Sequence, residues 1–380
     1  MKIRIAKNTF VNGLQQGLNV VGARSSLPIL SNVLLRAKEG VLELTTTNLD
    51  MGIRCAVKAT VLEEGCIALP ARKLASIVKA LPEAEIELEC SQNQAKLSAG
   101  CSKFRIMGMG DAEFPALPTF AQENVFSLEQ QTLATMLRYV SFAQSEDDNR
   151  YLLNGVFFAF RKEDGQSQLH LVATDGRRLS IMQKNLDVPG DFDNTEFILP
   201  AKTVAELERL LQQMALIKIY SNGKQVAFEI SLEEAAVESG LTSTIYLVSK
   251  KVEGRFPNYQ QVIPQTTSHR VKLDRSLLLE CIQRAALVSS QENNTVKLKF
   301  GENVLEIFAS SAEFGESHET MAIDYNEDPV TIAFNPRFLT DPLRALQEDE
   351  IFFEFKDELS PGVIKTLEKF LCVVMPLRVS

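Results

Sequence analysis

Apolar residues recur along this chain with two periods, one typical of strands and one typical of helices. Residues 1–6 alternate as a β-strand does, and residues 7–21 carry apolar side chains along one helical stripe. Residues 33–35 and 41–44 form a predicted hairpin around the polar turn at 38–40. The same periods predict further strands at 51–57, 86–90, 103–107, 156–160, 169–173, 296–300, 304–309, 351–356 and 363–365, and further helices at 131–142 and 275–288.

One helical segment with a proline near its start occurs three times. Pro70, Pro200 and Pro336 each follow an apolar strand end and precede an amphipathic helix with basic residues near its start. The copies are spaced by about 130 residues, which is the size of a domain. In a single copy such basic residues usually mark a solvated helix face, so the repetition is what makes them informative.

The order of elements repeats with the same period. Each pass contains a first helix, a series of strands and the proline-led helix, and the first two passes end in similar segments, Phe114–Pro118 and Arg255–Pro264. We therefore expect an α+β protein of three repeated domains, 1–121, 122–265 and 266–380, each with two helices packed on one face of a mainly antiparallel sheet.

Composition places the chain among soluble globular proteins. Its 380 residues are too many for one ordinary core, 45% of them are hydrophobic, and no run of about 18 apolar residues could cross a membrane. Met1–Ile5 alternates like a strand and does not open like a signal peptide, so we expect a cytoplasmic protein. The six cysteines and three histidines lie at no metal-ligand or redox spacing, which predicts reduced packing cysteines, no metal site and no cofactor.

The net charge of −9 argues against a nucleic-acid partner when it is taken alone. Affinity for phosphates depends on where the charges lie, however, and basic residues recur on or beside the predicted helices. Arg72, Lys73 and Lys202 lie in the first turns of proline-led helices, and Arg24 and Arg150 lie in loops after the first helices of two domains. If all helices line one surface, that surface is moderately positive.

One short string imitates a catalytic motif. Ser76 and Lys79 have the Ser-x-x-Lys spacing of an acylating serine, but the tripeptide and Lys-Thr-Gly partners of that constellation are not evident. Both residues also belong to a repeated helix. A serine hydrolase is therefore the weaker alternative, and we expect a chain that is not an enzyme.

Five motifs become informative when they are taken together and in order. They are Leu27-Pro28-Ile29-Leu30, Leu153-Asn154-Gly155, Ala173-Thr174-Asp175-Gly176-Arg177-Arg178-Leu179, Arg255-Phe256-Pro257-Asn258-Tyr259 with Ile263-Pro264, and Val373-Val374-Met375-Pro376-Leu377-Arg378. Together they resemble the bacterial sliding clamp family, the beta subunit of DNA polymerase III, over essentially the full length of the chain.

This resemblance implies a non-catalytic processivity factor for DNA replication. Two chains would join head to tail as a homodimeric ring around duplex DNA, with helices inside and sheets outside. Short peptides such as Gln-Leu-x-Leu-Phe would tether the replicative polymerase, the clamp loader and other partners. A ring that slides needs phosphate attraction without base readout, so an acidic total charge is compatible with DNA. A clamp-like scaffold that binds peptides without DNA is the alternative within this fold.

Three sets of site residues follow from the resemblance and from the basic and strand-edge positions. For duplex DNA they are Arg24, Arg72, Lys73, Arg150, Tyr151 and Lys202. For the peptide pocket they are Leu153, Thr174, Gly176, Arg177, Arg178, Leu179, Pro257, Val262, Asn335, Phe338, Val373, Val374, Met375, Pro376 and Leu377. For a dimer joint that continues one sheet across two chains they are Phe104, Arg105, Met107, Leu287, Val288, Glu313 and Glu316. Gln261 stands where the family often has Arg, and Phe338 where a Tyr is common, so peptide preference is expected to differ here.

Overall fold

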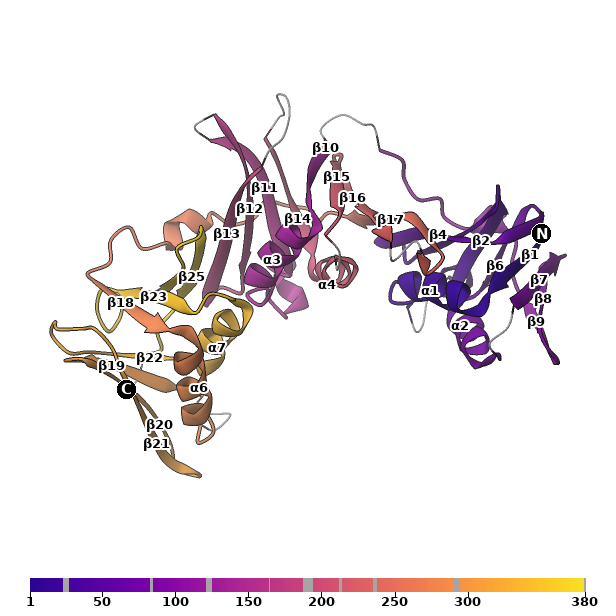
Figure 1. The fold of residues 1–380 in the computed structure, drawn as a ribbon. Coiled ribbons are helices and arrows are strands. Elements are labelled where there is room, and N and C mark those ends of the chain that lie inside the picture. The colour runs from indigo at the N-terminus through magenta and orange to yellow at the C-terminus, as the bar shows by residue number, and fades with distance from the viewer. Residues whose placement is uncertain are drawn as a thin grey trace. The chain divides into compact units, whose positions relative to one another are not determined.

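The fold is α+β, as predicted, and the strands of its sheets pair antiparallel. The chain was analysed as a computed structural model, which describes residues 1–22, 27–82, 85–120, 125–163, 165–186, 194–211, 214–234, 238–289 and 294–378. Figure 1 shows the order of its elements along the chain.

Contacts divide the chain into two compact units. The first unit consists of Met1–Ala134, Val188–Phe192 and Ala205–Lys251, and the second of Thr135–Asp187, Asp193–Val204 and Val252–Ser380. Two helices have residues in both units, α3 (Gln130–Ser141) and α4 (Ala201–Leu210).

The first unit contains two sheets. The five-stranded sheet has the order β5-β1-β7-β8-β9, with β1 (Lys2–Ala6), β5 (Thr60–Glu63), β7 (Glu85–Ser91), β8 (Gln94–Ala99) and β9 (Ser102–Met107). The eight-stranded sheet has the order β10-β15-β16-β17-β4-β3-β2-β6, with β2 (Asn32–Lys38), β3 (Val41–Thr47), β4 (Met51–Lys58), β6 (Gly65–Pro70), β10 (Val125–Glu129), β15 (Leu216–Ser221), β16 (Gln225–Ser231) and β17 (Leu241–Lys250).

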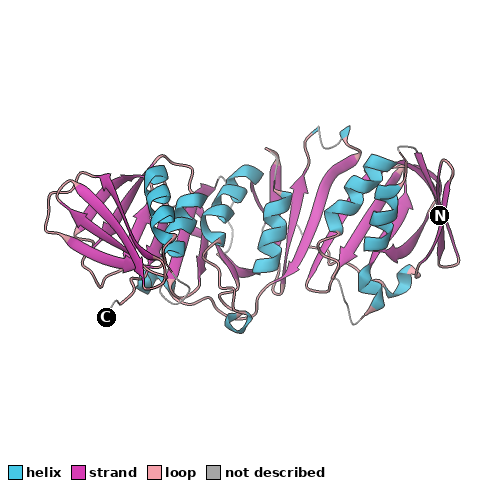
Figure 2. Ribbon diagram, turned by 90° about the horizontal axis from the view of Figure 1, so that it is seen from below, coloured by secondary structure: helices cyan, strands magenta, loops and turns pink. Residues whose placement is uncertain are grey.

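Two helices, α1 (Lys7–Gly17) and α2 (Ala71–Ala80), lie side by side against the eight-stranded sheet of this unit (Figure 2). The prediction extended α1 to Val21 and was wrong there. The carbonyl of Gly17 accepts hydrogen bonds from the Val20 N–H (3.2 Å) and from the Thr46 hydroxyl (3.1 Å). A tight turn and a side chain from β3 thus satisfy that carbonyl in place of a further helical turn.

The second unit also contains two sheets. The eight-stranded sheet has the order β14-β11-β12-β13-β25-β24-β23-β18, with β11 (Gly155–Glu163), β12 (Gln166–Thr174), β13 (Arg178–Leu186), β14 (Thr195–Pro200), β18 (His269–Asp274), β23 (Glu350–Phe355), β24 (Gly362–Lys365) and β25 (Phe370–Val374). The four-stranded sheet has the order β21-β20-β19-β22, with β19 (Val296–Gly301), β20 (Val304–Ser311), β21 (Gly315–Ala322) and β22 (Val330–Phe334).

Helices α6 (Arg275–Ala286) and α7 (Pro336–Ala345) of this unit pack against each other. Each begins at a side-chain cap. Asp274 accepts the Leu277 N–H at 2.8 Å, and Asn335 accepts the Arg337 N–H at 2.9 Å. None of the helices in the described ranges combines the length and hydropathy needed to span a membrane.

Both eight-stranded sheets run across the boundaries of the sequence repeat. In the first unit β4 pairs with β17, and in the second unit β13 pairs with β25. We call β4, β17 and the segment 114–120 the first junction, and β13, β25 and the segment 252–264 the second junction. The domain limits 1–121, 122–265 and 266–380 stay a prediction.

Candidate functional site

The turn between β12 and β13 is fixed by its own side chains. Thr174 Oγ1 donates to the Arg178 carbonyl at 2.6 Å and accepts the Gly176 N–H at 3.1 Å. Asp175 Oδ1 accepts the N–H groups of Arg177 and Arg178 at 2.9 and 3.0 Å. Gly176 has φ = 85°, a left-handed conformation that glycine adopts without side-chain strain. The tight turn expected from the sequence is present, with Gly176 and Arg177 exposed at its tip.

Arg178 is buried at the base of this turn and ties it to α7. Its Nε lies 3.1 Å from Asp175 Oδ2 and its Nη1 lies 2.7 Å from Asp341 Oδ2, while Nη2 donates to the Phe142 carbonyl. The guanidinium carbon also lies 4.8 Å from the ring centre of Phe338. Because a buried charge is tolerated only when it is paired, this network must stay complete for the turn to keep its place.

The C-terminal segment forms a second wall beside the turn. Val373 of β25 lies opposite Leu179 of β13. Beyond the strand, the Met375 N–H donates to the Arg177 carbonyl at 3.0 Å, and the Leu377 N–H donates to a carbonyl of β22 at 2.7 Å. The chain end is therefore held by backbone hydrogen bonds on both sides of Pro376.

The floor between these walls is apolar. Leu179 and Val373 belong to one buried cluster with Tyr259, and the Phe256 ring stacks on Phe157 with centres 4.9 Å apart. Sequence reasoning assigned Pro257 and Val262 to the pocket and missed the packing role of Phe256 and Tyr259, although their aromatic character was the available signal. Five of the predicted pocket side chains are more than a third exposed at the rim: Arg177, Pro257, Val262 (46%), Met375 (39%) and Leu377 (37%).

All the predicted pocket residues lie in the second unit. Leu153 precedes β11, and its N–H donates to the Arg150 carbonyl at 2.7 Å. Asn335 caps α7 and Phe338 lies in the first turn of that helix, half-buried under Arg178.

A cavity of about 290 Å³ adjoins the turn and is lined mainly by arginine and acidic side chains. Arg150 donates to the Asp175 carbonyl at 3.0 Å and lies 3.8 Å from Asp147. Arg337, in α7, forms an ion pair with Glu146 at 2.6 Å. One predicted DNA-binding residue, Arg150, therefore also contacts the turn of the pocket.

The other predicted DNA-binding residues lie at exposed positions. Arg72 and Lys202 occupy the same position in α2 and α4, each directly after the first helical residue, and Lys73 follows Arg72. Arg72 also donates to the Val21 carbonyl at 2.8 Å, and Tyr151 is 58% exposed. Arg24 lies outside the described residues.

The residues of the alternative hydrolase show an ordinary helical contact. The Ser76 hydroxyl donates to the Arg72 carbonyl one turn earlier in α2, at 2.8 Å. Among the residues that the structure describes, no three His, Cys, Asp or Glu side chains gather as metal ligands.

The predicted dimer residues lie on or near two edge strands. Strand β9 is an edge of the five-stranded sheet, and on it Phe104 is 41% exposed, Met107 is 63% exposed and Arg105 is exposed. Strand β21 is an edge of the four-stranded sheet. Around it, Glu313 and Glu316 are exposed, Leu287 is 79% exposed and Val288 is partly buried.

Comparison with known proteins covers the whole chain. Family sequence models of the DNA polymerase III beta subunit match residues 1–118 (N-terminal domain), 127–258 (central domain) and 260–378 (C-terminal domain). The beta sliding clamp of Chlamydia muridarum is 31% identical over 379 residues, which cover 100% of this chain and 99% of that protein.

Solved structures agree with the sequence matches. The DNA polymerase III subunit beta of Pseudomonas aeruginosa superposes with a TM-score of 0.91 at 29% identity, and a sliding clamp of that organism bound to griselimycin does so with a TM-score of 0.90 at 30% identity. Each comparison covers 100% of both chains.

Proposed function

The chain belongs to the DNA polymerase III beta subunit family and is a DNA sliding clamp, and we propose that it tethers its partners through a peptide pocket at the second junction. The head-to-tail dimeric ring is a property of this family. One observation carries the pocket assignment: the Thr174–Arg178 turn and the Met375–Leu377 segment are joined by a backbone hydrogen bond beside an apolar floor.

The chemistry of this place suits a short peptide. Leu179 and Val373 belong to the buried apolar cluster beneath this place, and the exposed side chains of Val262, Met375 and Leu377 at the rim can receive a partner's hydrophobic anchors. Met375 has a flexible side chain that adapts to different anchors. Gly176 allows the peptide backbone to approach closely. The griselimycin-bound relative supports a ligand site on this fold.

Deletion of residues 375–380 tests the pocket. The truncated chain loses one wall and the hydrogen bonds of Met375 and Leu377, so we expect calorimetric titration with Gln-Leu-Ala-Leu-Phe to show affinity at least about tenfold weaker. Sedimentation should still show the dimer. Equal affinity of intact and truncated chains would refute the assignment.

Substitutions in the peptide test its specificity. Because Gln261 carries no charge where relatives have Arg, replacing acidic residues that flank the peptide by Lys should change affinity only about twofold or less.

We also propose that Arg24, Arg72, Lys73, Arg150, Tyr151 and Lys202 contact duplex DNA through its backbone. The repeated position of Arg72 and Lys202 and the exposure of Lys73 support this. Lys73→Ala and Lys202→Ala should each lower the slope of the logarithm of the DNA-binding constant against the logarithm of salt concentration by about one. Lys38→Ala, at the end of strand β2, should leave this slope unchanged. Unchanged slopes in both helix variants would exclude this placement. Retention on circular but not linear DNA separates a clamp from a peptide scaffold.

For the dimer we propose that β9 of one chain pairs with β21 of the next. Exposed edges with basic residues on β9 and acidic residues near β21 support the pairing. Arg105→Glu with Phe104→Ala should give monomers, and a purely dimeric sedimentation profile would exclude the joint.

We further propose that the chain acts in the cytoplasm and has no catalytic activity of its own, as expected for a polymerase accessory subunit.

A further inference from the structure

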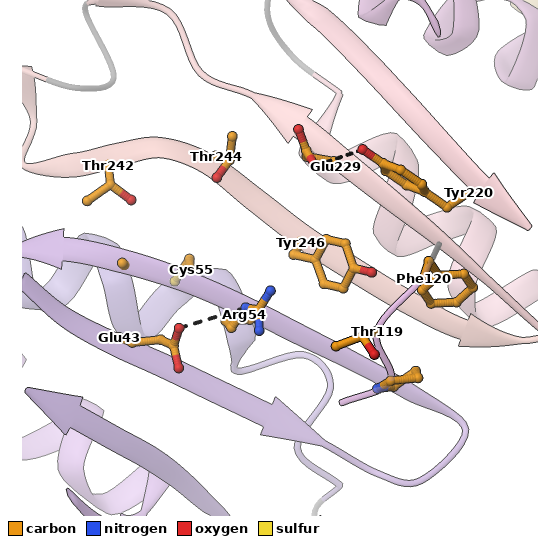
Figure 3. Close-up of a pocket in the computed structure, with 12 residues that line it drawn as sticks. Glu43, Arg54, Cys55, Thr119, Phe120, Tyr220, Glu229, Thr242, Thr244 and Tyr246 are labelled. Carbon is orange, nitrogen blue, oxygen red and sulfur yellow. Dashed lines mark hydrogen bonds and ion pairs between the residues drawn. The ribbon is translucent and has the colours of Figure 1, made fainter. Parts of the chain in front are cut away.

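The first junction contains an open pocket of about 550 Å³ that the proposed function does not use. It lies where the segment 114–120 crosses the sheet, and Figure 3 shows side chains from β3, β4, β15, β16 and β17 converging on it. Its position in the first unit separates it from the Thr174 turn, which belongs to the second.

The sheet is irregular beneath this pocket. Leu241 of β17 pairs with Val57 of β4, and the next pair along is Ile245 with Cys55. Three residues of β17 therefore face one residue of β4, so the strand bulges at this point. Thr242 and Thr244 of this bulge both line the pocket.

Arg54 is the central charged group. Its guanidinium carbon lies 5.0 Å from the ring centre of Tyr246, and its Nε lies 3.8 Å from Glu43 (Figure 3). Among the described residues it has no hydrogen bond to a protein acceptor, and its side chain is 43% exposed. A guanidinium that lies over an aromatic ring and donates no hydrogen bond to the protein has N–H groups available for a carboxylate, which it can bind with two hydrogen bonds.

The neighbouring groups are also donors. Within the described chain, the hydroxyls of Thr119, Thr242, Thr244 and Tyr246 have no protein partner. Burial raises the pKa of Tyr246 above its ordinary value, so its phenol keeps its proton near neutral pH.

The acidic residues of the pocket already have partners. Glu229 accepts the Tyr220 hydroxyl at 3.0 Å and the Lys218 ammonium at 3.2 Å, and Glu43 faces Arg54. Among the groups without a protein hydrogen bond, the hydroxyls can donate and the positively charged Arg54 guanidinium can only donate, which favours a ligand with a carboxylate over a cationic one. A nucleic acid is disfavoured, because a run of phosphates would pass close to two carboxylates.

An apolar wall completes the pocket. The Phe120 ring lies 6.5 Å from the Tyr220 ring and packs, half-buried, against a cluster that includes Val248. We propose that this pocket binds an extended peptide segment of a partner protein, with a Glu or Asp carboxylate on Arg54 and an aromatic side chain against Phe120.

The probe is the peptide acetyl-Gly-Glu-Gly-Phe-Gly-amide with a trifluoromethyl group on the phenylalanine ring. Fluorine NMR relaxation measures its weak binding to the full dimeric protein, and the same peptide with Gln for Glu is the matched control. We expect the Glu peptide to saturate the protein at submillimolar concentration. The affinity of the Gln peptide should be lower by at least about tenfold.

Protein variants locate the site. Arg54→Met keeps the length of the side chain and should weaken binding about tenfold or more, and Phe120→Ala should weaken it severalfold. Arg4→Met, on strand β1 of the five-stranded sheet and outside the pocket, should leave binding unchanged. Thermal melts of each variant check folding, and Phe120→Ala tests the site while Arg54 is intact.

Three results of the peptide titrations would overturn the proposal. They are equal binding of the Glu and Gln peptides, equal binding by wild type and Arg54→Met, and no saturation of the Glu peptide at millimolar concentration. Decathymidylate is titrated in parallel. If it binds more tightly than the peptide and loses affinity in Arg54→Met, the pocket is a single-stranded nucleic-acid site and the peptide proposal is wrong.

Discussion

The two junctions of this molecule share a backbone turn and differ in what covers it. At the first junction Thr47 Oγ1 donates to the Met51 carbonyl and accepts the Leu49 N–H, and Asn48 Oδ1 accepts the next two N–H groups at 3.0 and 2.8 Å. Thr174 and Asp175 make the same four hydrogen bonds at the second junction. The turn is therefore a repeated unit of local chemistry, and it does not by itself create a binding pocket.

The first residue after each turn determines whether its own side chain or one from another segment fills the space beside the turn. Gly52 occupies the position that Leu179 occupies at the second junction, five residues after the turn's threonine. The Leu117 side chain takes the space above it, because a Cβ on Gly52 would lie 2.3 Å from Leu117 Cδ2. At the second junction the buried side chain of Leu179 fills the corresponding space itself.

The sheets differ in the same way two residues further along. Arg54 lies opposite Tyr246 in the first junction, and Ile181 lies opposite Leu371 at the same register in the second. Ile181 packs in the buried cluster with Tyr259, whereas Arg54 lines an open pocket. One backbone plan thus gives an apolar, packed cluster in one place and a polar cavity in the other.

Two buried cysteines report on the junctions separately. Cys55 of β4 and Cys372 of β25 are both buried, and burial raises the pKa of each thiol to about 12. Each should react with a thiol reagent only when its junction opens, so mass spectrometry of labelling at each cysteine measures the two opening equilibria.

The largest expected effect comes from Arg178→Met. The variant leaves the carboxylates of Asp175 and Asp341 without their buried partner, which should cost about 3–5 kcal/mol. Labelling at Cys372 should rise at least about a hundredfold while labelling at Cys55 stays unchanged. Arg54→Met, which removes a partly exposed pair, should change neither rate by more than a few fold.

Alkaline pH should weaken the first unit through Tyr220. Burial, and then its hydrogen bond to Glu229, raises the pKa of Tyr220 to about 12, whereas the unfolded chain titrates near 10. The raised pKa therefore adds roughly 2 kcal/mol to the free energy of unfolding below pH 10, and this contribution is lost as pH rises through 12. Between pH 9 and pH 11.5, the free energy of unfolding in urea should fall more for wild type than for Tyr220→Phe. Equal decreases in the two proteins would contradict this assignment.

Gly52→Ala should weaken the first junction by about 1–2 kcal/mol, because the new methyl group displaces Leu117. Labelling of Cys55 should rise about tenfold. In the double variant with Leu117→Ala the penalty should shrink, since the colliding side chain is gone. Additive penalties would show that another contact, such as the Thr46 carbonyl, carries the cost.

The smallest effect concerns the two turn tips, where the signs should differ. Leu49 has φ = 76°, a conformation that disfavours a side chain, so Leu49→Gly should stabilise the first junction by about 0.5–1 kcal/mol. Gly176→Ala should destabilise the second by about the same amount, because its φ is 85°. Hydrogen exchange of the turn amides measures both stability changes. If the two substitutions changed stability in the same direction, the backbone angle would not be the controlling factor.

The elements and their repetition could be predicted from the order of residues alone. Apolar spacing located the three proline-led helices, and the Thr174-Asp175-Gly176 string specified a tight turn. These features could be predicted because a helix, a cap or a turn depends on residues a few positions apart. The motifs that indicate the family are likewise short and contiguous.

The side chains that meet at the junctions come from distant parts of the chain and could not be predicted from local patterns. Arg54 and Tyr246 are cross-strand neighbours although many strands lie between them in sequence, and Arg178 reaches Asp341 in another repeat. Strand register and burial depend on the whole sheet, so no local pattern shows that Leu117 covers Gly52 or that a bulge at Thr242 opens a cavity. Local chemistry fixed the repeated parts, and packing between distant segments gave each junction its own surface.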